Sequence, residues 1–344
     1  MTYSSTACIF ALTLATFGSV NAQPSPDAAT RVGVDNFARA ESDLYMGKMV
    51  ESGGFGRFVH SREPVPIDAQ NVIRMNRDTL YSSAVFDLEA GPVTITLPEA
   101  GGRFMSMAVV NEDHYVPTVV YGAGRHTLTK ENVGTRYVFV AVRTFFDPTD
   151  RKDLEHVHAL QDAIKVSQTR AGEFVVPKWD QASQQKMRDA LAVLGSTIPD
   201  YNQSFGPKGT VNPIHHLIGT ATGWGGNPAR DAIYLGGVMP ENDGKTVYRL
   251  KVGEVPVNGF WSVSVYNADG YFQKNPGDAY SLNNLTAKKN DDGSMVIQFG
   301  GCDAKIVNCL PTTPGWNYTV RLYQPSEQIL NGKWHFPQPQ PVPF

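Results

Sequence analysis

The chain has 344 residues, a formal net charge of −3 at pH 7 and 18% charged residues. This length is more than one hydrophobic core usually serves, so we expect two domains. Because no block of like charge occurs along the chain, the sequence argues against nucleic acid or an anionic membrane surface as a partner.

Residues 1–22 have the features of a signal peptide. Residues 9–20 are mostly small or apolar, and Val20-Asn21-Ala22 follows the small-x-small pattern of a cleavage site. No Lys or Arg precedes the apolar run, which leaves a disordered leader or a membrane anchor as alternatives, although the run is short for a membrane span. The sequence therefore predicts a periplasmic or secreted protein, with a flexible leader at 23–30 and no transmembrane span after cleavage.

Residues 31–148 are expected to form a helix followed by a β-domain. The helix ends at Gly53-Gly54, and Glu41 lies on its apolar face, where a carboxylate is unusual. The apolar positions at helical spacing are Val34, Phe37, Ala38, Leu44, Tyr45 and Met49. Strands are predicted at 93–97, 103–110, 115–121 and 137–143, where β-branched and aromatic residues alternate with others between turn residues. This pattern is typical of antiparallel sheets.

A helical segment and a long loop are expected over residues 149–226. Asp150 can cap a helix that continues to about Ile164, and a second helix is predicted at 178–194, where Gly195 stops it. Residues 199–226 are rich in Gly, Pro and Asn and are predicted to be a loop. Strands return in 227–344, at 246–252, 260–266, 294–299 and 318–323, which predicts a second β-sandwich domain.

Cys302 and Cys309 are the two cysteines that remain once residues 1–22 are removed. Close cysteines in an exported protein usually form a disulfide, and closing so small a loop should contribute only about 2–3 kcal/mol. A reduced pair or a metal pair is the alternative, although two thiols alone make a poor zinc site.

Three stretches together carry a family resemblance: residues 75–82 (MNRDTLYS), residues 260–270 (FWSVSVYNADG), and Asn275-Pro276 followed by Tyr280-Ser281. Over roughly residues 35–337 the chain resembles bacterial exported proteins that pair domain of unknown function 1254 with domain of unknown function 1214. The resemblance implies an N-terminal immunoglobulin-like β-domain, a helical insertion and a C-terminal jelly-roll-like sandwich. It implies no established reaction. The helical middle is shorter than in longer members, and the cysteine pair is not carried over from the family.

The polar run before the first strand is the main candidate site. Arg77 could bind an anion, Asp78 could act as a base or orient a neighbour, Tyr81 could donate a proton, and Asn76 could contact substrate. The alternative is a buried polar network that holds the first strand against the helices. We predict that Arg77 and Asp78 are largely buried at the junction of the two β-domains, with Glu41 as a third charged partner.

Other candidate residues come from the aromatic strands and from one strand end. Tyr266 and Tyr280 are candidates for a substrate cleft, since aromatic rings stack on sugars or apolar ligands. Trp261 is also a candidate, although strand alternation favours a place for it in the core. Asp113 and His114 are weak candidates for a metal site, because a solvated loop is the commoner reason for such a pair.

These observations leave three functional hypotheses. The first is a small-molecule-binding protein or cofactor-free acid–base enzyme, a hydrolase or lyase, with its cleft between the two β-domains. The second is a non-catalytic envelope or carbohydrate-binding module that uses the aromatic strands. The third is a metal-dependent hydrolase that uses Asp113 and His114. A small-molecule or glycan ligand is the expected partner, and the sequence does not indicate the oligomeric state.

Overall fold

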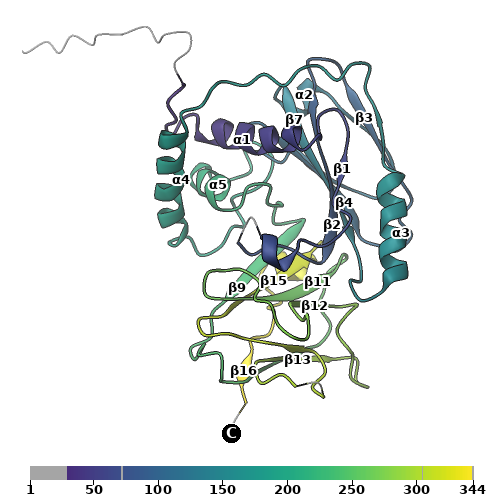
Figure 1. The fold of residues 1–344 in the computed structure, drawn as a ribbon, viewed down its shortest axis with the longest axis vertical. Helices are drawn as coiled ribbons and strands as arrows, with labels where there is room; N and C mark the ends of the chain where they lie inside the picture. The colour runs from purple at the N-terminus through teal and green to yellow at the C-terminus, as the bar shows by residue number, and fades with distance from the viewer. Residues whose placement is uncertain (1–28, 71–72, 304, 343–344) are drawn as a thin grey trace, which may run out of the picture.

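The computed structural model describes residues 29–70, 73–303 and 305–342. Two β-sandwiches lie end to end, and several helices cover the outside of the N-terminal one (Figure 1). The predicted signal peptide and most of the predicted leader lie outside the described residues. Within the described part, no helix has the length and apolar character needed to span a bilayer.

The N-terminal sandwich consists of a five-stranded and a three-stranded antiparallel sheet. The larger sheet has the order β1 (Val59–His60), β2 (Thr79–Asp87), β7 (Tyr137–Phe145), β4 (Met105–Asn111) and β5 (Thr118–Tyr121). The smaller has the order β6 (Gly124–Leu128), β3 (Val93–Leu97) and β8 (Lys165–Ser167). Alternate side chains of β3 are buried, as its VTITL sequence predicts, and they pack against Val109, Val140 and other apolar residues between the sheets.

Helices cover both sides of this sandwich. Helix α1 (Phe37–Glu51) packs with α4 (Gln181–Gly195) and α5 (Pro213–Thr222), while α3 (Arg151–Asp162) lies on the other side and α2 (Lys130–Val133) is a single turn (Figure 1). Asp150 caps α3 as predicted, accepting a hydrogen bond from the Lys152 N–H. The prediction of a loop over 199–226 is wrong for α5. Asn212 caps that helix and Pro213 begins it. The prediction of a loop followed the Gly-rich composition of the segment and overlooked these two helix-start signals.

Glu41 is fully buried between α1 and α4, and its partner is Arg188. The Arg188 Nε and Nη2 donate to the two carboxylate oxygens at 2.8 and 2.7 Å, and Gln184 donates to one of them at 2.9 Å. The expectation that Glu41 belongs to a cluster with Arg77 and Asp78 is therefore wrong. The apolar face of α1 contacts α4, and the cation that neutralises Glu41 comes from that helix.

The C-terminal sandwich also has two sheets. One has the order β12 (Ser281–Asn283), β11 (Trp261–Tyr266), β15 (Asn317–Tyr323) and β9 (Ala232–Gly237), and all its neighbours are antiparallel. The other has the order β14 (Cys309–Leu310), β13 (Met295–Phe299), β10 (Tyr248–Val252) and β16 (Gln340–Pro341). The short helix α6 (Glu327–Leu330) follows β15, and the single 3₁₀ turn η1 (Ile67–Ala69) lies in the N-terminal half. The predicted fold class, mainly β with two sandwich domains, is confirmed.

The predicted disulfide is present between Cys302 and Cys309, whose Cα atoms lie 5.6 Å apart. It closes the loop between β13 and β14, two strands that pair in parallel. Two strands that pair in parallel cannot be joined by a tight hairpin, so the connection between them is a longer loop.

Candidate acid–base site between the domains

One face of the β12-β11-β15-β9 sheet is polar and yet buried. Along β11, Trp261, Val263 and Val265 point into the sandwich core, so the intervening residues point to the opposite face. That face is covered by residues 74–79 of the N-terminal domain. The Tyr266 hydroxyl donates to the Met75 carbonyl at 2.8 Å, which joins the two domains directly.

Arg321 and Asp78 are the most deeply buried charges on this face, with 3% and 1% of their surfaces exposed. Arg321 donates to Ser264 Oγ at 3.0 Å, to the Tyr266 hydroxyl at 2.8 Å, and to the main chain at Arg74. Burial alone would lower the pKa of Arg321, but the nearby tyrosines and Asp78 outweigh it and raise the pKa. The guanidinium therefore stays charged, and it holds the two domains together.

Asp78 reaches the C-terminal domain through different partners. Its Oδ1 accepts hydrogen bonds from Ser281 Oγ and Asn283 Nδ2, both at 3.2 Å. Its Oδ2 is buried and has no hydrogen-bond partner among the described residues. The carboxylate lies close enough to Arg321 to contribute to its raised pKa.

Arg77 also lies at the junction, but it is only partly buried. Its guanidinium lies over the Tyr280 ring, 5.3 Å from the centroid, and donates to the Val65 carbonyl. Burial lowers its pKa, an effect that Tyr280, Asp278 and Asp78 only partly offset. Arg321 rather than Arg77 is thus the buried cation that neighbours Asp78.

A second group of residues surrounds Arg143 on the face of the five-stranded sheet that is turned away from the sandwich core. We call it the Arg143 cluster, and its members are Asn76, Tyr81, Tyr121, Arg143, Tyr234 and Tyr323. Tyr81 and Arg143 are direct cross-strand partners, with the guanidinium 5.4 Å from the ring centroid. Tyr234 and Tyr323 come from β9 and β15, so both domains contribute to the cluster.

Arg143 is buried and has unused hydrogen-bonding capacity. Its Nη2 donates to the Gly225 carbonyl at 3.1 Å, while its Nη1 finds no partner within the part of the chain that the structure describes. Burial opposes the charge, but Tyr81, Tyr234 and Tyr323 more than offset it, so the pKa of Arg143 is raised. A charged guanidinium with free donors is suited to binding a carboxylate or a developing oxyanion.

Two tyrosines of the cluster have pKa values displaced in opposite directions. Burial would raise the pKa of Tyr81, but the Arg143 charge and hydrogen bonds from polar neighbours outweigh it and lower the pKa. The pKa of Tyr323 is raised well above its usual value by burial and by the neighbouring Tyr234 and Tyr81 hydroxyls. Asn76 Nδ2 lies between the two phenols, 3.3 Å from Tyr81 Oη and 3.1 Å from Tyr323 Oη. Opposite shifts in adjacent groups are a feature of acid–base pairs, and structural networks can produce them as well.

The remaining aromatic candidates do not offer open binding surfaces. Tyr266 and Tyr280 are 1% and 6% exposed and pack around Phe272 in a small apolar cluster. Trp261 lies in the sandwich core, 6.0 Å from the Phe336 ring. None of the three presents a free ring face on which a sugar could stack.

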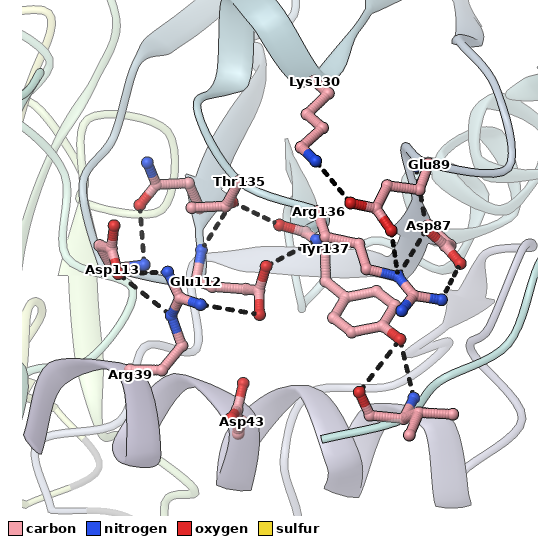
Figure 2. Close-up of polar contacts among 12 residues, drawn as sticks. Arg39, Asp43, Asp87, Glu89, Glu112, Asp113, Lys130, Thr135, Arg136 and Tyr137 are labelled. Atoms are coloured by element: carbon pink, nitrogen blue, oxygen red, sulfur yellow. Dashed lines mark hydrogen bonds and ion pairs between the residues drawn. The ribbon is translucent and has the colours of Figure 1, made fainter. Parts of the chain in front are cut away.

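Asp113 and His114 belong to separate contacts. Asp113 pairs with Arg39 at 2.6 Å (Figure 2). His114 Nδ1 lies 2.8 Å from Thr220 Oγ1, and its Nε2 accepts the Gly225 N–H at 2.9 Å. With both ring nitrogens engaged, His114 has no free lone pair for a metal. Nowhere in the described ranges do three His, Cys, Asp or Glu side chains group so as to hold a metal ion.

Figure 2 shows two groups of ion pairs at the edge of the N-terminal sandwich, and one of them attaches α1 to it. Arg39 of α1 pairs with Asp113 and Glu112 beyond the end of β4, and on the far side Arg136 pairs with Asp87 and Glu89. Asp43 faces the same region, and its Oδ2 accepts the Trp179 indole N–H at 2.8 Å. Two carboxylates thus pair with the Arg39 guanidinium, and Asp43 lies within its electrostatic influence.

Asp43 should make the stability of the protein depend on pH. Burial raises its pKa from 3.8 to about 6, and Glu112 and Asp113 add to the shift while Trp179 and Arg39 oppose it. Between those two values the native state binds a proton that the unfolded chain lacks, so stability falls as pH rises. Asp43→Asn keeps the Trp179 bond and removes the carboxylate. We expect it to flatten this pH dependence and to stabilise the protein by up to about 3 kcal/mol at neutral pH.

Urea unfolding of the wild type and Asp43→Asn at a series of pH values measures this effect. The exposed Asp35→Asn is the matched control and should follow the wild type. Parallel curves for wild type and Asp43→Asn would show that Asp43 titrates normally in the native state.

Sequence reasoning missed Arg143, Arg321 and Tyr323. Each arginine lies inside an apolar strand, YVFVAVRTF for Arg143 and NYTVRLY for Arg321. A charged residue in a buried strand is costly unless it is paired, and this was the signal that could have identified both.

Comparisons with known proteins agree with this architecture of two sandwiches. Residues 55–132 match the family described as protein of unknown function (DUF1254), and residues 239–327 match protein of unknown function (DUF1214). The chain therefore pairs a DUF1254 domain with a DUF1214 domain, and the predicted resemblance is confirmed. A search of curated proteins found no match.

Two solved structures resemble the fold. The VPA0106 protein from Vibrio parahaemolyticus has a TM-score of 0.70 and 17% identity, over 90% of this chain and 98% of that one. A putative uncharacterized protein from Burkholderia cenocepacia has a TM-score of 0.52 and 13% identity, over 90% and 88% of the two chains. At these identities the similarity shows the fold alone.

Proposed function

We propose that this protein is an exported, cofactor-free acid–base enzyme, a hydrolase or lyase, that acts on a small organic anion at the Arg143 cluster. The observation that carries the proposal is geometric: the Arg143 guanidinium, whose Nη1 has no partner among the described residues, lies over the Tyr81 ring, and Asn76 bridges Tyr81 and Tyr323 across the domain junction. Export rests on the apolar leader and its small-x-small site.

The charge and the pKa shift of each residue in the Arg143 cluster indicate its role in the proposed reaction. Arg143 binds the anionic group of the substrate through its free Nη1. Tyr81, whose pKa the Arg143 charge lowers, removes a proton from the substrate or from an attacking water in its phenolate form. Tyr323, whose raised pKa keeps it protonated, donates a proton to the leaving group. Turnover leaves Tyr81 protonated and Tyr323 deprotonated, and proton exchange with solvent restores the starting state.

Access to the cluster supports this assignment. Asn76, Tyr81 and Tyr234 are partly exposed, whereas Arg143 and Tyr323 lie deeper. The proposal therefore places the base on the more exposed side of the cluster and the guanidinium deeper. The non-catalytic carbohydrate-binding alternative has less support, because the rings of Tyr266 and Tyr280 are packed into the protein.

A ligand screen followed by a turnover assay tests the proposal. Purified protein is screened by thermal shift against small carboxylates, their esters and hydroxy acids, and each compound that stabilises it is followed by proton NMR for conversion. We expect at least one compound both to stabilise the protein and to be converted. Stabilisation without conversion, unchanged in Arg143→Met, would reject the proposed site. Stabilisation that Arg143→Met abolishes, again without conversion, would leave a binding protein.

A further inference from the structure

A depression of about 330 Å³ lies on the outer face of the β14-β13-β10-β16 sheet, in the C-terminal domain. We call it the outer-sheet pocket. Arg249 of β10 and Val296 and Gln298 of β13 line it, together with Lys288 and Lys289 of the preceding turn and the disulfide loop. Its volume is at the lower end of the range for small-molecule sites. None of these residues belongs to the junction described above.

The charge of this pocket is one-sided. Arg249, Lys288 and Lys289 contribute three cations, and the other lining residues are amides and apolar side chains. Across the described residues, none of the three cations forms an ion pair. Unneutralised cations around a concave surface favour an anionic ligand.

Hydrogen bonds hold the Arg249 side chain in place. Its Nε donates to Gln298 Oε1 at 3.2 Å, and Gln298 Nε2 donates in turn to the Gly300 carbonyl at 3.1 Å. Among the described residues the two Nη groups of Arg249 have no hydrogen-bond partner, and they have the fork geometry that binds a carboxylate or a phosphate through two hydrogen bonds.

The disulfide loop forms one wall of the pocket and is fixed on both sides. Asn308 accepts the Lys288 N–H and donates to the Lys288 carbonyl, both at 2.8 Å. The next residue, Cys309, pairs with Gln298 in the parallel ladder and is bonded to Cys302. The loop also contributes Ile306 and Val307 to the pocket lining, which Val296 completes as the third apolar residue.

We propose that the outer-sheet pocket binds a small organic anion with a short apolar chain. Its charged group lies among Arg249, Lys288 and Lys289, and its chain lies along Val296, Ile306 and Val307. The bond between Cys302 and Cys309 holds the apolar wall, so binding depends on the oxidised protein. This site is separate from the Arg143 cluster and does not depend on the function proposed there.

Calorimetric titration with hexanoate tests the proposal, with hexanol as the neutral analogue and inorganic phosphate as the anion without a chain. We expect hexanoate to bind. Arg249→Gln or Lys288→Gln should lower the hexanoate affinity about tenfold, because each removes one charged contact. Lys251→Gln is the matched control, because Lys251 lies on the same strand outside the pocket and pairs with Asp292. The double variant Cys302→Ser/Cys309→Ser should also bind more weakly.

Three results would overturn the proposal. The first is equal hexanoate affinity in wild type, Arg249→Gln and Lys288→Gln. The second is equal affinity for hexanoate and hexanol, which would remove the role of charge. The third is equal affinity for phosphate and hexanoate, which would remove the apolar chain. A hexanoate event at the Arg143 cluster is recognised because it persists in Arg249→Gln and is lost in Arg143→Met.

Discussion

Arg321→Leu should lower the free energy of unfolding by about 3–5 kcal/mol, because it removes a buried, hydrogen-bonded cation and leaves the nearby Asp78 carboxylate buried without it. The substitution leaves the buried Asp78 carboxylate without its neighbouring cation. It also removes the donors that satisfy Ser264, the Tyr266 hydroxyl and the main chain of the N-terminal domain at Arg74. Because these contacts join the two domains, the substitution weakens the junction between them.

Urea denaturation of three variants measures this loss. Asp78→Asn is nearly isosteric, and in the Arg321→Leu background it should recover part of the lost stability by removing the stranded charge. Arg77→Leu is the matched control, and it should cost about 1 kcal/mol, because Arg77 is partly exposed and its guanidinium makes fewer hydrogen bonds than that of Arg321. If Arg77→Leu were the more damaging change, Arg321 would not be the cation that holds the junction.

Tyr81→Phe should reduce kcat by about 10²–10⁴-fold, the typical contribution of a general base. The variant keeps the aromatic ring under Arg143 and removes only the hydroxyl, so its melting temperature should stay close to that of the wild type. The wild-type rate should rise with pH through the lowered pKa of Tyr81, because the phenolate is the active form.

The assay uses whichever small organic anion the proton NMR screen finds to be converted. Tyr201→Phe is the control, since Tyr201 is a partly exposed tyrosine that stacks on Phe205 outside the Arg143 cluster. An unchanged kcat in Tyr81→Phe, or an equal loss in Tyr201→Phe, would exclude Tyr81 as the base.

Strand alternation and helix caps could be predicted from the sequence because each depends on residues close together in the chain. The predicted strand at 93–97 matches β3, and Asp150 caps α3, since both depend on neighbours within a few residues. Helix α5 was missed because its cap and its proline lie among residues that usually form loops. Its apolar residues have their partners on α1 and α4, which no local pattern reveals.

For the same reason, the sequence predicted only one part of the candidate site. Asn76, Asp78 and Tyr81 stand together in one polar run, and the structure places all three at the junction. Their partners lie far along the chain: Tyr323 is 247 residues from Asn76, and Asn283 is 205 residues from Asp78. The sequence predicted a group of polar side chains at this place. Only the fold shows that Arg143 and Arg321 are the arginines beside them.

The most direct test of the acid–base assignment is a spectrophotometric titration of the tyrosines in the native protein. The ultraviolet absorbance of tyrosinate is followed as pH rises, in the wild type, Tyr81→Phe and Arg143→Met, with circular dichroism to confirm that the fold persists. We predict one tyrosine that ionises below the usual pKa of 10.0 in the wild type. That ionisation should vanish in Tyr81→Phe and move to higher pH in Arg143→Met. A first ionisation at or above the usual value, the same in all three proteins, would contradict the assignment of Tyr81 as the base.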